Sequence, residues 1–332
     1  MVVRRRRHAL TIAAALSGVA LFAYAVQRAG VDEIIDGIRK VGWGLLPILG
    51  LAGLRFLIRA SSWRLCMPPS ARIPFGQAFS AFLAGDAIGN VTPLGMVASE
   101  PAKVFLTRHR LATRESIASL AIDNLLYAAS VVGVVILGVV VLLVTVPLPF
   151  EWREAAVITI VVAVIGIAVA LRLLQGTWRE DGGPRPPWRE SLAGLRRSVL
   201  AFSSDQPWRG FRVFLLDLSF HVVAIFEVFL TLRWILGDGS PTLAQAIVFE
   251  ALNRVVTVVF KFVPFRVGID EALSGVLAPV IAVQPVAGVT LAVVRKARNL
   301  LWTGIGLLLI AAHPAHAEPG TDHRENAPAR RI

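Results

Sequence analysis

Two stretches, Pro93-Leu-Gly-Met-Val-Ala-Ser-Glu-Pro-Ala-Lys-Val-Phe-Leu106 and Pro264-Phe-Arg-Val-Gly-Ile-Asp-Glu-Ala-Leu-Ser-Gly-Val-Leu277, decide the fold of this chain because they repeat one pattern. Each has a proline seven residues before a glutamate and a helix-capping residue directly before that glutamate, and each then becomes apolar. A matching pair follows: Asp123-Asn-Leu-Leu-Tyr127 and Arg298-Asn-Leu-Leu-Trp302. A duplicated, proline-broken and charged element in an apolar chain predicts a membrane transport site at the interface between two repeats.

The composition indicates that the lipid bilayer is the solvent of this chain. It has 332 residues, is 55% hydrophobic and only 17% charged, and has a mean hydropathy of +0.67. The net charge is +12, but the basic residues flank apolar runs, which favours contact with anionic lipid over nucleic acid. Cys66 is the single cysteine, so no intrachain disulfide forms. No cysteine and histidine cluster has metal-ligand spacing, and we expect no metal and no cofactor.

The apolar runs predict an all-α, polytopic membrane protein with two inverted repeats and two re-entrant, proline-broken helical segments. We expect one transmembrane domain over residues 1–312, with repeat one at 42–146, a cytoplasmic linker at 175–210 and repeat two at 211–312. A disordered tail follows at 313–332. The expected spans are residues 9–26, 43–58, 117–146, 155–173, 211–236 and 286–312. The first of these also resembles a cleaved signal peptide, because Ala23-Tyr24-Ala25 is typical of a cleavage site.

Arginine is distributed unevenly between the predicted loops. With the N-terminus in the cytoplasm, the cytoplasmic segments hold Arg4 to Arg7, Arg59, Arg64, Arg108 and most of the linker arginines. The opposite side holds few cations, which are offset by acids. This asymmetry predicts cytoplasmic N- and C-termini. The first broken region then enters the membrane from the cytoplasm and the second from the outside, so the repeats are predicted to have inverted topology.

The broken segments have the features of a binding site. Irregular backbone survives at membrane depth only inside protein or beside water. Pro93 and Pro264 each end the preceding helix, and Ser99 and Asp270 are predicted as N-caps of new short helices, whose N–H groups attract carboxylate or phosphate. The acidic residues that follow could instead satisfy their own helix starts, bind a proton or hold arginine. These are Glu100 and Glu271.

Polar side chains also follow helical spacing on the neighbouring predicted helices, which suggests a shared hydrated cavity. Internal ion pairs that only hold helices together, such as Glu250 with Arg254, are the alternative. Cations outnumber acids around the second copy, which favours an anionic group such as a lipid phosphate. The predicted substrate-binding residues are Arg254, Lys261, Arg295, Arg298, Ser99 and Asp270. Gating or proton coupling is assigned to Glu100, Glu271, Asp123, His221 and Glu227.

One part of the linker is predicted to be an amphipathic helix. Residues 188–202 carry Leu192, Leu195, Val199 and Phe202 on one face, which suits a helix lying on the inner leaflet. A short solvated connector is the alternative.

The ordered set of markers resembles the flippase-like family that includes the transmembrane part of lysylphosphatidylglycerol synthases, over roughly residues 9–312. The resemblance implies an inner-membrane protein with re-entrant helices that moves lipids between leaflets, of the bacterial cytoplasmic membrane type. The aminoacyl transferase domain of the bifunctional synthases is not expected here. One departure is Arg266, where the family pattern usually has glycine. The markers are Trp63, Pro93 to Glu100, Asp123, His221 with Glu227, the segment 262–271, and Arg298 with Trp302.

Three functions follow as hypotheses. The first is a lipid translocase without enzymatic activity, which moves an anionic or phosphate-bearing membrane lipid. The second is a membrane enzyme acting on a lipid phosphate, although no nucleophile–base arrangement is visible. The third is a non-transporting membrane partner of an enzyme of lipid or envelope biosynthesis. The partner predictions are membrane lipids with an anionic headgroup, with a homo-oligomer or a biosynthetic enzyme left open.

Overall fold

The structure, a computed structural model, describes residues 31–92, 95–175, 187–237, 239–260, 263–266 and 268–312, and within these ranges every regular element is helical. The all-α prediction is confirmed. The helices α3 (Leu45–Cys66) and α9 (Pro207–Leu236) cross the middle of the molecule antiparallel to each other. At one end Arg209 donates to the carbonyl of Met67 at 2.6 Å. At the other end the Trp234 ring occupies the space that a Cβ on Gly44 would need.

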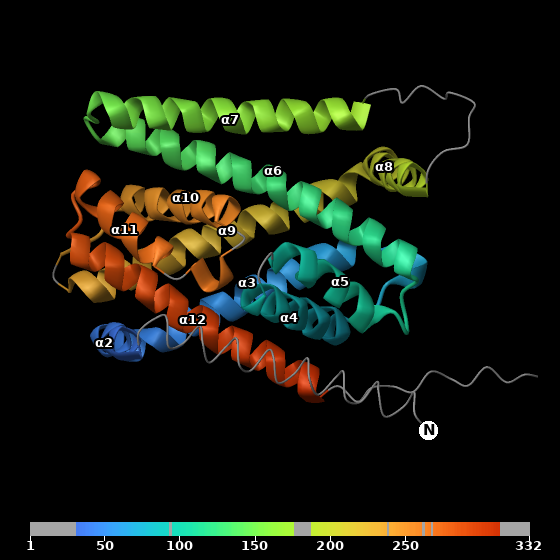
Figure 1. The fold of residues 1–332 in the computed structure, drawn as a ribbon, viewed down its shortest axis with the longest axis horizontal. Helices are drawn as coiled ribbons and strands as arrows, with labels where there is room; N and C mark the ends of the chain where they lie inside the picture. Colours follow the sequence, from blue (N-terminus) through green and yellow to red (C-terminus); the bar gives the residue numbers. More distant parts are fainter. Residues whose placement is uncertain are drawn as a thin grey trace, which may run out of the picture.

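Four further helices pack around this central pair in two matching contacts (Figure 1). The helix α4 (Phe75–Val91) packs on α12 (Pro285–Ala312), and α10 (Leu243–Val259) packs on α6 (Thr113–Thr145). Each contact has a glycine of the long helix against the short one. A Cβ at Gly138 of α6 would collide with Ala251 of α10, and a Cβ at Gly306 of α12 would collide with Ala87 of α4. Backbones approach closely where small residues meet, as is common between membrane helices.

Two short helices complete the proline-broken regions. The helix α5 (Gly95–Thr107) packs back against α4, and both lie at the end of the molecule where α6 begins. The helix α11 (Ile269–Val280) follows α10 and the short helix η3 (Pro264–Arg266), and it lies at the opposite end, where α12 begins. The backbone breaks are therefore present. The chain is extended at Thr92 and left-handed at Phe265 and Arg266, with φ near 50°.

Both predicted N-caps were wrong. Ser99 lies inside α5, which already begins at Gly95, and it is buried against α4. The N-cap of α11 is Gly268, with φ of 83°, and Asp270 is the second residue of the helix. Glycine takes this left-handed conformation without the steric cost that a Cβ brings. The backbone N–H of Gly268 donates to Glu271 at 3.0 Å, so Glu271 caps its own helix start, as one of the sequence alternatives anticipated.

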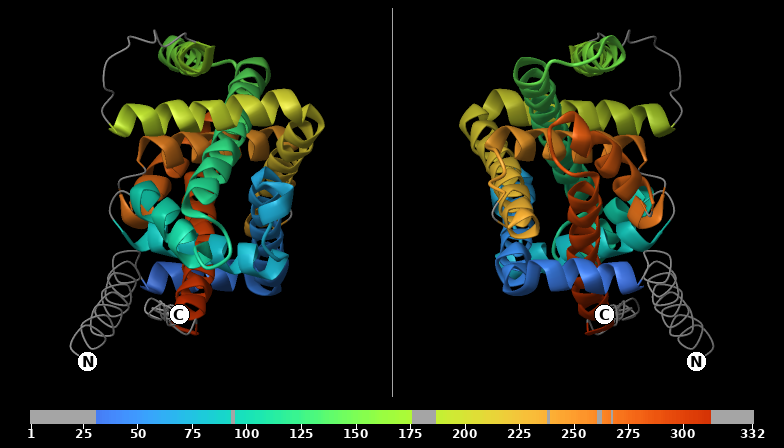
Figure 2. Two further views of the ribbon diagram at one scale, coloured as in Figure 1. Left: turned by 90° about the vertical axis from the view of Figure 1, so that its right-hand side faces the viewer. Right: turned by 90° about the vertical axis from the view of Figure 1, so that its left-hand side faces the viewer.

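Two helices lie across the direction of the long ones, one at each end of the molecule (Figures 1 and 2). These are α2 (Val31–Val41), which packs on α12, and α8 (Pro187–Asp205), which packs on α6. Short 3-10 turns, η1 (Gly42–Gly44) and η2 (Pro69–Ala71), flank α3. The predicted linker helix is thus present in α8, and its Val199 and Phe202 pack against Cys66 and Val213.

The outer surface of the helices is strongly apolar. Three helical stretches within the described residues are long and apolar enough to cross a membrane: Ile35–Cys66, Thr113–Thr145 and Pro207–Leu236. The 26-residue helix α7 (Phe150–Gln175) packs on α6 and leaves most of its apolar side chains uncovered. These include Val157, Ile158, Val161, Val162, Val164, Ile165 and Val169. The predicted span at residues 9–26 and the predicted tail at 313–332 lie outside the described residues.

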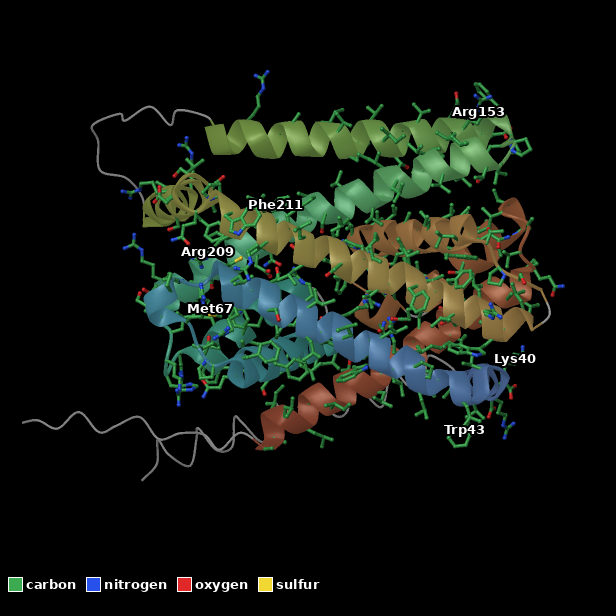
Figure 3. All side chains as sticks on the ribbon, turned by 180° about the vertical axis from the view of Figure 1, so that it is seen from behind. Lys40, Trp43, Met67, Arg153, Arg209 and Phe211 are labelled. Carbon is green, nitrogen blue, oxygen red and sulfur yellow. The ribbon has the colours of Figure 1, made fainter. Side chains whose placement is uncertain are left out.

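The two ends of the molecule are marked in Figure 3. Lys40, Trp43 and Arg153 lie at one end, which we call the α2 end, and Met67, Arg209 and Phe211 lie toward the other, which we call the α8 end. The long helices run between these ends.

Candidate functional site: a buried network of ion pairs

Three groups of charged side chains occupy the interior, and the first joins the central helices α3 and α9 to α6. Arg59 of α3 donates to Asp217 of α9 at 2.6 Å and to Asp123 of α6 at 2.7 Å. The hydroxyl of Ser62 lies 2.8 Å from Asp123 and 3.1 Å from Asp217. All four side chains are buried. We call Arg59, Asp123 and Asp217 the acidic triad, because one guanidinium faces two carboxylates and the group has one more acid than base.

The second group gathers around Glu227 of α9. Its carboxylate accepts from Arg55 of α3 at 3.1 Å and also from Arg298 of α12. The Arg298 side chain donates in addition to Asn299 at 2.8 Å. Glu227 is only 1% exposed. Glu227, Arg55 and Arg298 form the first basic triad, which has one more cation than acid, whereas the acidic triad has one more acid than base.

The third group gathers around Glu250 of α10 and has the same composition. Its carboxylate accepts from Arg254, one turn further along α10, and from Arg295 of α12 at 3.1 Å. The hydroxyl of Tyr127 accepts from Arg254 at 3.0 Å, which ties this second basic triad to α6. Two carboxylates and four arginines thus meet between α3, α9, α10 and α12.

Aromatic rings separate and support the three triads. The Arg59 guanidinium lies 4.0 Å from the centroid of the Tyr127 ring, and Arg55 and Arg254 lie 4.6 and 5.1 Å from that of Phe220. A cation over an aromatic face is stabilised by the ring quadrupole, and the attraction is larger when the pair is desolvated. His221 stacks on Tyr127 and places its Nε2 3.1 Å from the hydroxyl of Ser130.

Smaller pairs lie on the short helices. On α5, Lys103 donates to Glu100 at 2.9 Å. On α11, Glu271 accepts from Lys296 of α12. At the break before α11, Arg266 donates to Asp270 at 3.1 Å and to Thr257 at 2.9 Å. The backbone of Arg266 has the left-handed conformation that glycine adopts most easily. Its side chain also binds polar groups on two helices, α10 and α11.

The structure brings five of the thirteen predicted site residues into this network, while Glu100 and Glu271 pair with lysines outside it. Arg254, Arg295 and Arg298 meet in the basic triads, with Glu227 as a direct partner, while Asp123 belongs to the acidic triad. Ser99 and Asp270 do not join them. The residues Pro93 and Lys261 lie outside the described residues, and Pro264 begins η3 in the second backbone break.

Sequence reasoning missed three members of the network and misplaced one of them. Arg59 was assigned to the cytoplasmic side, but it is 5% exposed and lies between three helices. Arg55 and Asp217 were not among the predicted site residues. A signal was available, because Arg55 and Arg59 are four residues apart and so share one face of a helix, as do Asp217 and His221.

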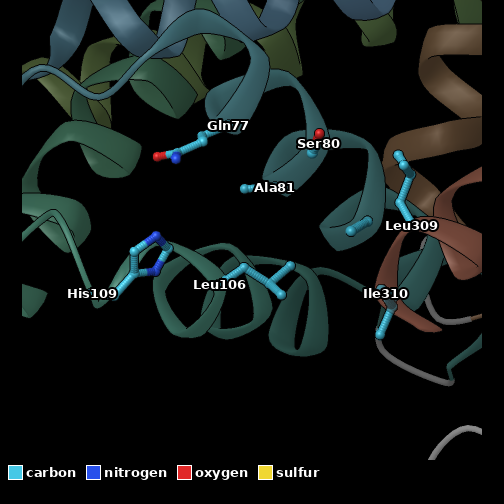
Figure 4. Close-up of a pocket in the computed structure, with 8 residues that line it drawn as sticks. Gln77, Ser80, Ala81, Leu106, His109, Leu309 and Ile310 are labelled. Atoms are coloured by element: carbon cyan, nitrogen blue, oxygen red, sulfur yellow. The ribbon is translucent and has the colours of Figure 1, made fainter. Parts of the chain in front are cut away.

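The expected open, hydrated chamber is not what the described residues form around these charges. The acidic and basic groups are buried and contact one another directly. A small surface hollow lies elsewhere, between α4, α5 and α12 toward the α8 end (Figure 4). Its lining residues are Gln77, Ser80, Ala81, Ala84, Leu106, His109, Leu309 and Ile310. The ion-pair alternative raised for Glu250 and Arg254 therefore describes this conformation.

Apolar outer faces and ion pairs inside define a polytopic α-helical membrane protein with a polar interior, in which contacts between opposite charges offset part of the cost of desolvation. Residues 9–306 match the family described as the lysylphosphatidylglycerol synthase TM region. The match covers most of the chain, so the chain belongs to this family. No curated protein and no solved structure matches it. The family assignment supports a membrane protein related to lipid handling, in contact with membrane lipids.

Proposed function

We propose that this protein moves an anionic or phosphate-bearing lipid between the two leaflets of a bacterial-type cytoplasmic membrane. The observation that carries the proposal is the pair of basic triads, in which the three buried arginines Arg254, Arg295 and Arg298 and the part-buried Arg55 share two carboxylates, Glu227 and Glu250. Each triad has one cation in excess, and a phosphate diester has the charge and the oxygen atoms to bind it. In this proposal a headgroup displaces one carboxylate–arginine contact while its acyl chains stay in lipid.

Inverted repeats would give such a site its alternating access. Several matching contacts support two inverted copies: α3 with α9, α4 on α12 as α10 on α6, and α2 on α12 as α8 on α6. The α4–α5 and α10–α11 pairs lie at opposite ends, as two re-entrant hairpins of inverted orientation would. The first basic triad joins α3 to α9 and α12 and so bridges both copies, whereas the second lies on α10 and α12 and reaches the other copy through Tyr127 of α6.

The proposed orientation places the α8 end in the cytoplasm. Arg108, Arg110 and Arg114 lie at the α5–α6 turn of this end, and Arg197 lies on α8. Cationic loops are retained on the cytoplasmic side, and they favour the anionic inner leaflet. We expect no catalytic step in this function.

A lipid-translocation assay with matched variants tests the proposal. Purified protein is reconstituted into liposomes that contain a fluorescent anionic or zwitterionic lipid, and the fraction accessible to a membrane-impermeant quencher is followed. The variants Arg298→Gln and Arg295→Gln each remove one excess cation and leave the remaining Glu–Arg pair intact. Charge-assisted contacts contribute about 1.5–3 kcal/mol, so movement of the anionic lipid should slow roughly tenfold or more.

The matched control is Arg39→Gln, which alters an exposed arginine of α2. It should leave the rate unchanged, and the zwitterionic lipid should respond less to the two interior variants. If wild-type protein moves neither lipid, or if both interior variants move the anionic lipid at the wild-type rate, the proposal is wrong. Conversion of a phosphate-labelled lipid to a new product would favour the membrane enzyme instead.

A further inference from the structure

The acidic triad contains one hydrogen-bond contact for which two ionised carboxylates supply no proton. The Ser62 hydroxyl has a single hydrogen, yet it lies within hydrogen-bond distance of one oxygen of Asp123 and one of Asp217. Carboxylates only accept hydrogen bonds when they are ionised. One of the two contacts would then join two acceptors. A proton on one of the two carboxyl groups removes the charge from that acceptor, and the hydroxyl then donates to the other, ionised carboxylate.

The charges of this group lead to the same conclusion. Asp123 and Asp217 are 1% and 0% exposed, and the one guanidinium within ion-pair distance of both is Arg59, among the residues that the structure describes. With both acids ionised, one buried negative charge has no partner. Two carboxylates that share one site do not readily ionise together, and desolvation adds to the cost. Binding one proton makes the triad neutral.

Asp217 is the member that has room for the proton. Both oxygens of Asp123 accept from Arg59, at 3.4 and 2.7 Å, whereas Asp217 makes its contacts through Oδ1 alone. Its Oδ2 is buried and has no hydrogen-bond partner among the described residues. One turn along the same face of α9, the Nδ1 of His221 is also buried and without a partner there. Two buried polar atoms without hydrogen-bond partners among the described residues, Asp217 Oδ2 and His221 Nδ1, thus lie one turn apart on α9.

Other ionisable groups act on this pair from several helices, and they do not supply a second compensating cation. Lys103, the nearest additional base, is already paired with Glu100. Arg209 donates to backbone carbonyls at the end of α3. The charged and titratable groups around the pair are Arg59 and Cys66 on α3, Glu100 and Lys103 on α5, Tyr127 on α6, and Arg209 and His221 on α9.

We infer that Asp123 and Asp217 together bind a single proton, carried mainly by Asp217, and that Arg59 and Ser62 hold the pair in place. Loss of that proton leaves a buried negative charge between α3, α6 and α9, which favours separation of these helices or entry of a cation. The site thus couples proton binding to the contact between the two repeats. This coupling, though not the proton site itself, rests on the proposed lipid translocation.

Infrared spectroscopy of the purified full-length protein tests the proton site directly. Wild-type protein at neutral pH should show the C=O stretching band of a buried protonated carboxyl group, and this band should disappear as the pH is raised. Asp217→Asn should abolish the band, because the amide is isosteric with the protonated acid. Asp123→Asn should abolish it too, because the remaining Asp217 then pairs with Arg59 as an anion. The exposed acid Glu151, changed to Gln, is the control and should retain it.

A stability measurement covers the case in which one variant folds poorly. Above the pH at which the unfolded carboxyl ionises, the folded wild type holds a proton that the unfolded chain has released, so its stability should fall as pH rises. Asp217→Asn should flatten this dependence. Absence of the band from folded wild-type protein at neutral pH, or its survival in both Asn variants, would overturn the proton site.

A pH gradient across the liposomes tests the coupling. The gradient should change the rate of lipid movement by wild-type protein but not by Asp217→Asn. If wild-type protein moves no lipid while the infrared band behaves as expected, the proposed function fails and the proton site stands. If lipid moves but the band is missing, the proton site fails and the proposed function stands. Equal responses of both proteins to the gradient would refute the coupling alone.

Discussion

Two single carboxylates, Glu227 and Glu250, each hold two arginines in the interior of this protein. Glu227 joins α9 to α3 and α12, and Glu250 joins α10 to α12. Each accepts from two guanidinium groups in a place with almost no access to water. Removing such an acid leaves two buried cations, whereas removing one of its arginines leaves a neutral pair. The two kinds of substitution should therefore differ strongly.

At the scale of the residue we predict that Glu227→Gln destabilises the fold far more than Arg298→Gln. Breaking a buried ion pair by removal of one partner costs about 3–5 kcal/mol, because the remaining charge stays uncompensated. Arg298→Gln leaves Arg55 with Glu227 and should cost clearly less. Denaturant unfolding of both variants in the same detergent measures the difference. Equal stabilities would mean that Glu227 does not compensate both arginines.

Residue-level prediction from the sequence reached part of this network. Charged residues at helical spacing on an apolar chain predicted Arg254, Arg295 and Arg298 as interior groups, and the same spacing pairs Arg254 with Glu250. Arg59 was misread because arginine near the end of an apolar run is usually a sign of the membrane surface. Which helix faces which is a tertiary property, so the pairing of Arg59 with two acids from distant helices was not visible in the spacing.

At the scale of the helix, two glycines set how closely the long and short helices approach. Gly138 packs against Ala251, and Gly306 against Ala87, with no room for a methyl group. These two similar contacts involve glycines that do not correspond in the sequence repeat, which aligns residues 123–127 with 298–302. The proline pattern predicted the broken segments, but α5 already begins at Gly95 and the N-cap of α11 is Gly268, so Ser99 and Asp270 lie inside their helices.

We predict opposite effects for two glycine substitutions on α6. Gly138→Ala should destabilise the protein, because its Cβ would overlap the Ala251 methyl group and force α10 away. Gly133→Ala should be neutral or stabilising, since a Cβ there meets no atom within 4 Å and alanine is favoured over glycine in a helix by about 1 kcal/mol. Thermal unfolding in detergent compares the two. A loss of stability in both variants would contradict close packing as the cause.

For the whole molecule, the proposed orientation predicts which surface each end of the molecule faces. In a Cys66→Ala background, single cysteines at Lys40 and Arg153, both at the α2 end, should react with a membrane-impermeant maleimide in intact cells. Cysteines at Arg110 and Ser204, at the α8 end, should react only after permeabilisation. All four positions are exposed. Labelling of all four from one side would refute the arrangement of the two ends, and the reverse pattern would refute the orientation.

The helices α2 and α8 occupy corresponding positions at the two ends of the molecule, which matters for how the chain enters the membrane. In the proposed architecture of two inverted copies, the packed structure is nearly the same whichever way up it lies. The translocation machinery then has little besides the arginines of a few turns by which to tell inside from outside. Transferring those charges from one rim to the other should yield a well-packed molecule that stands upside down in its bilayer.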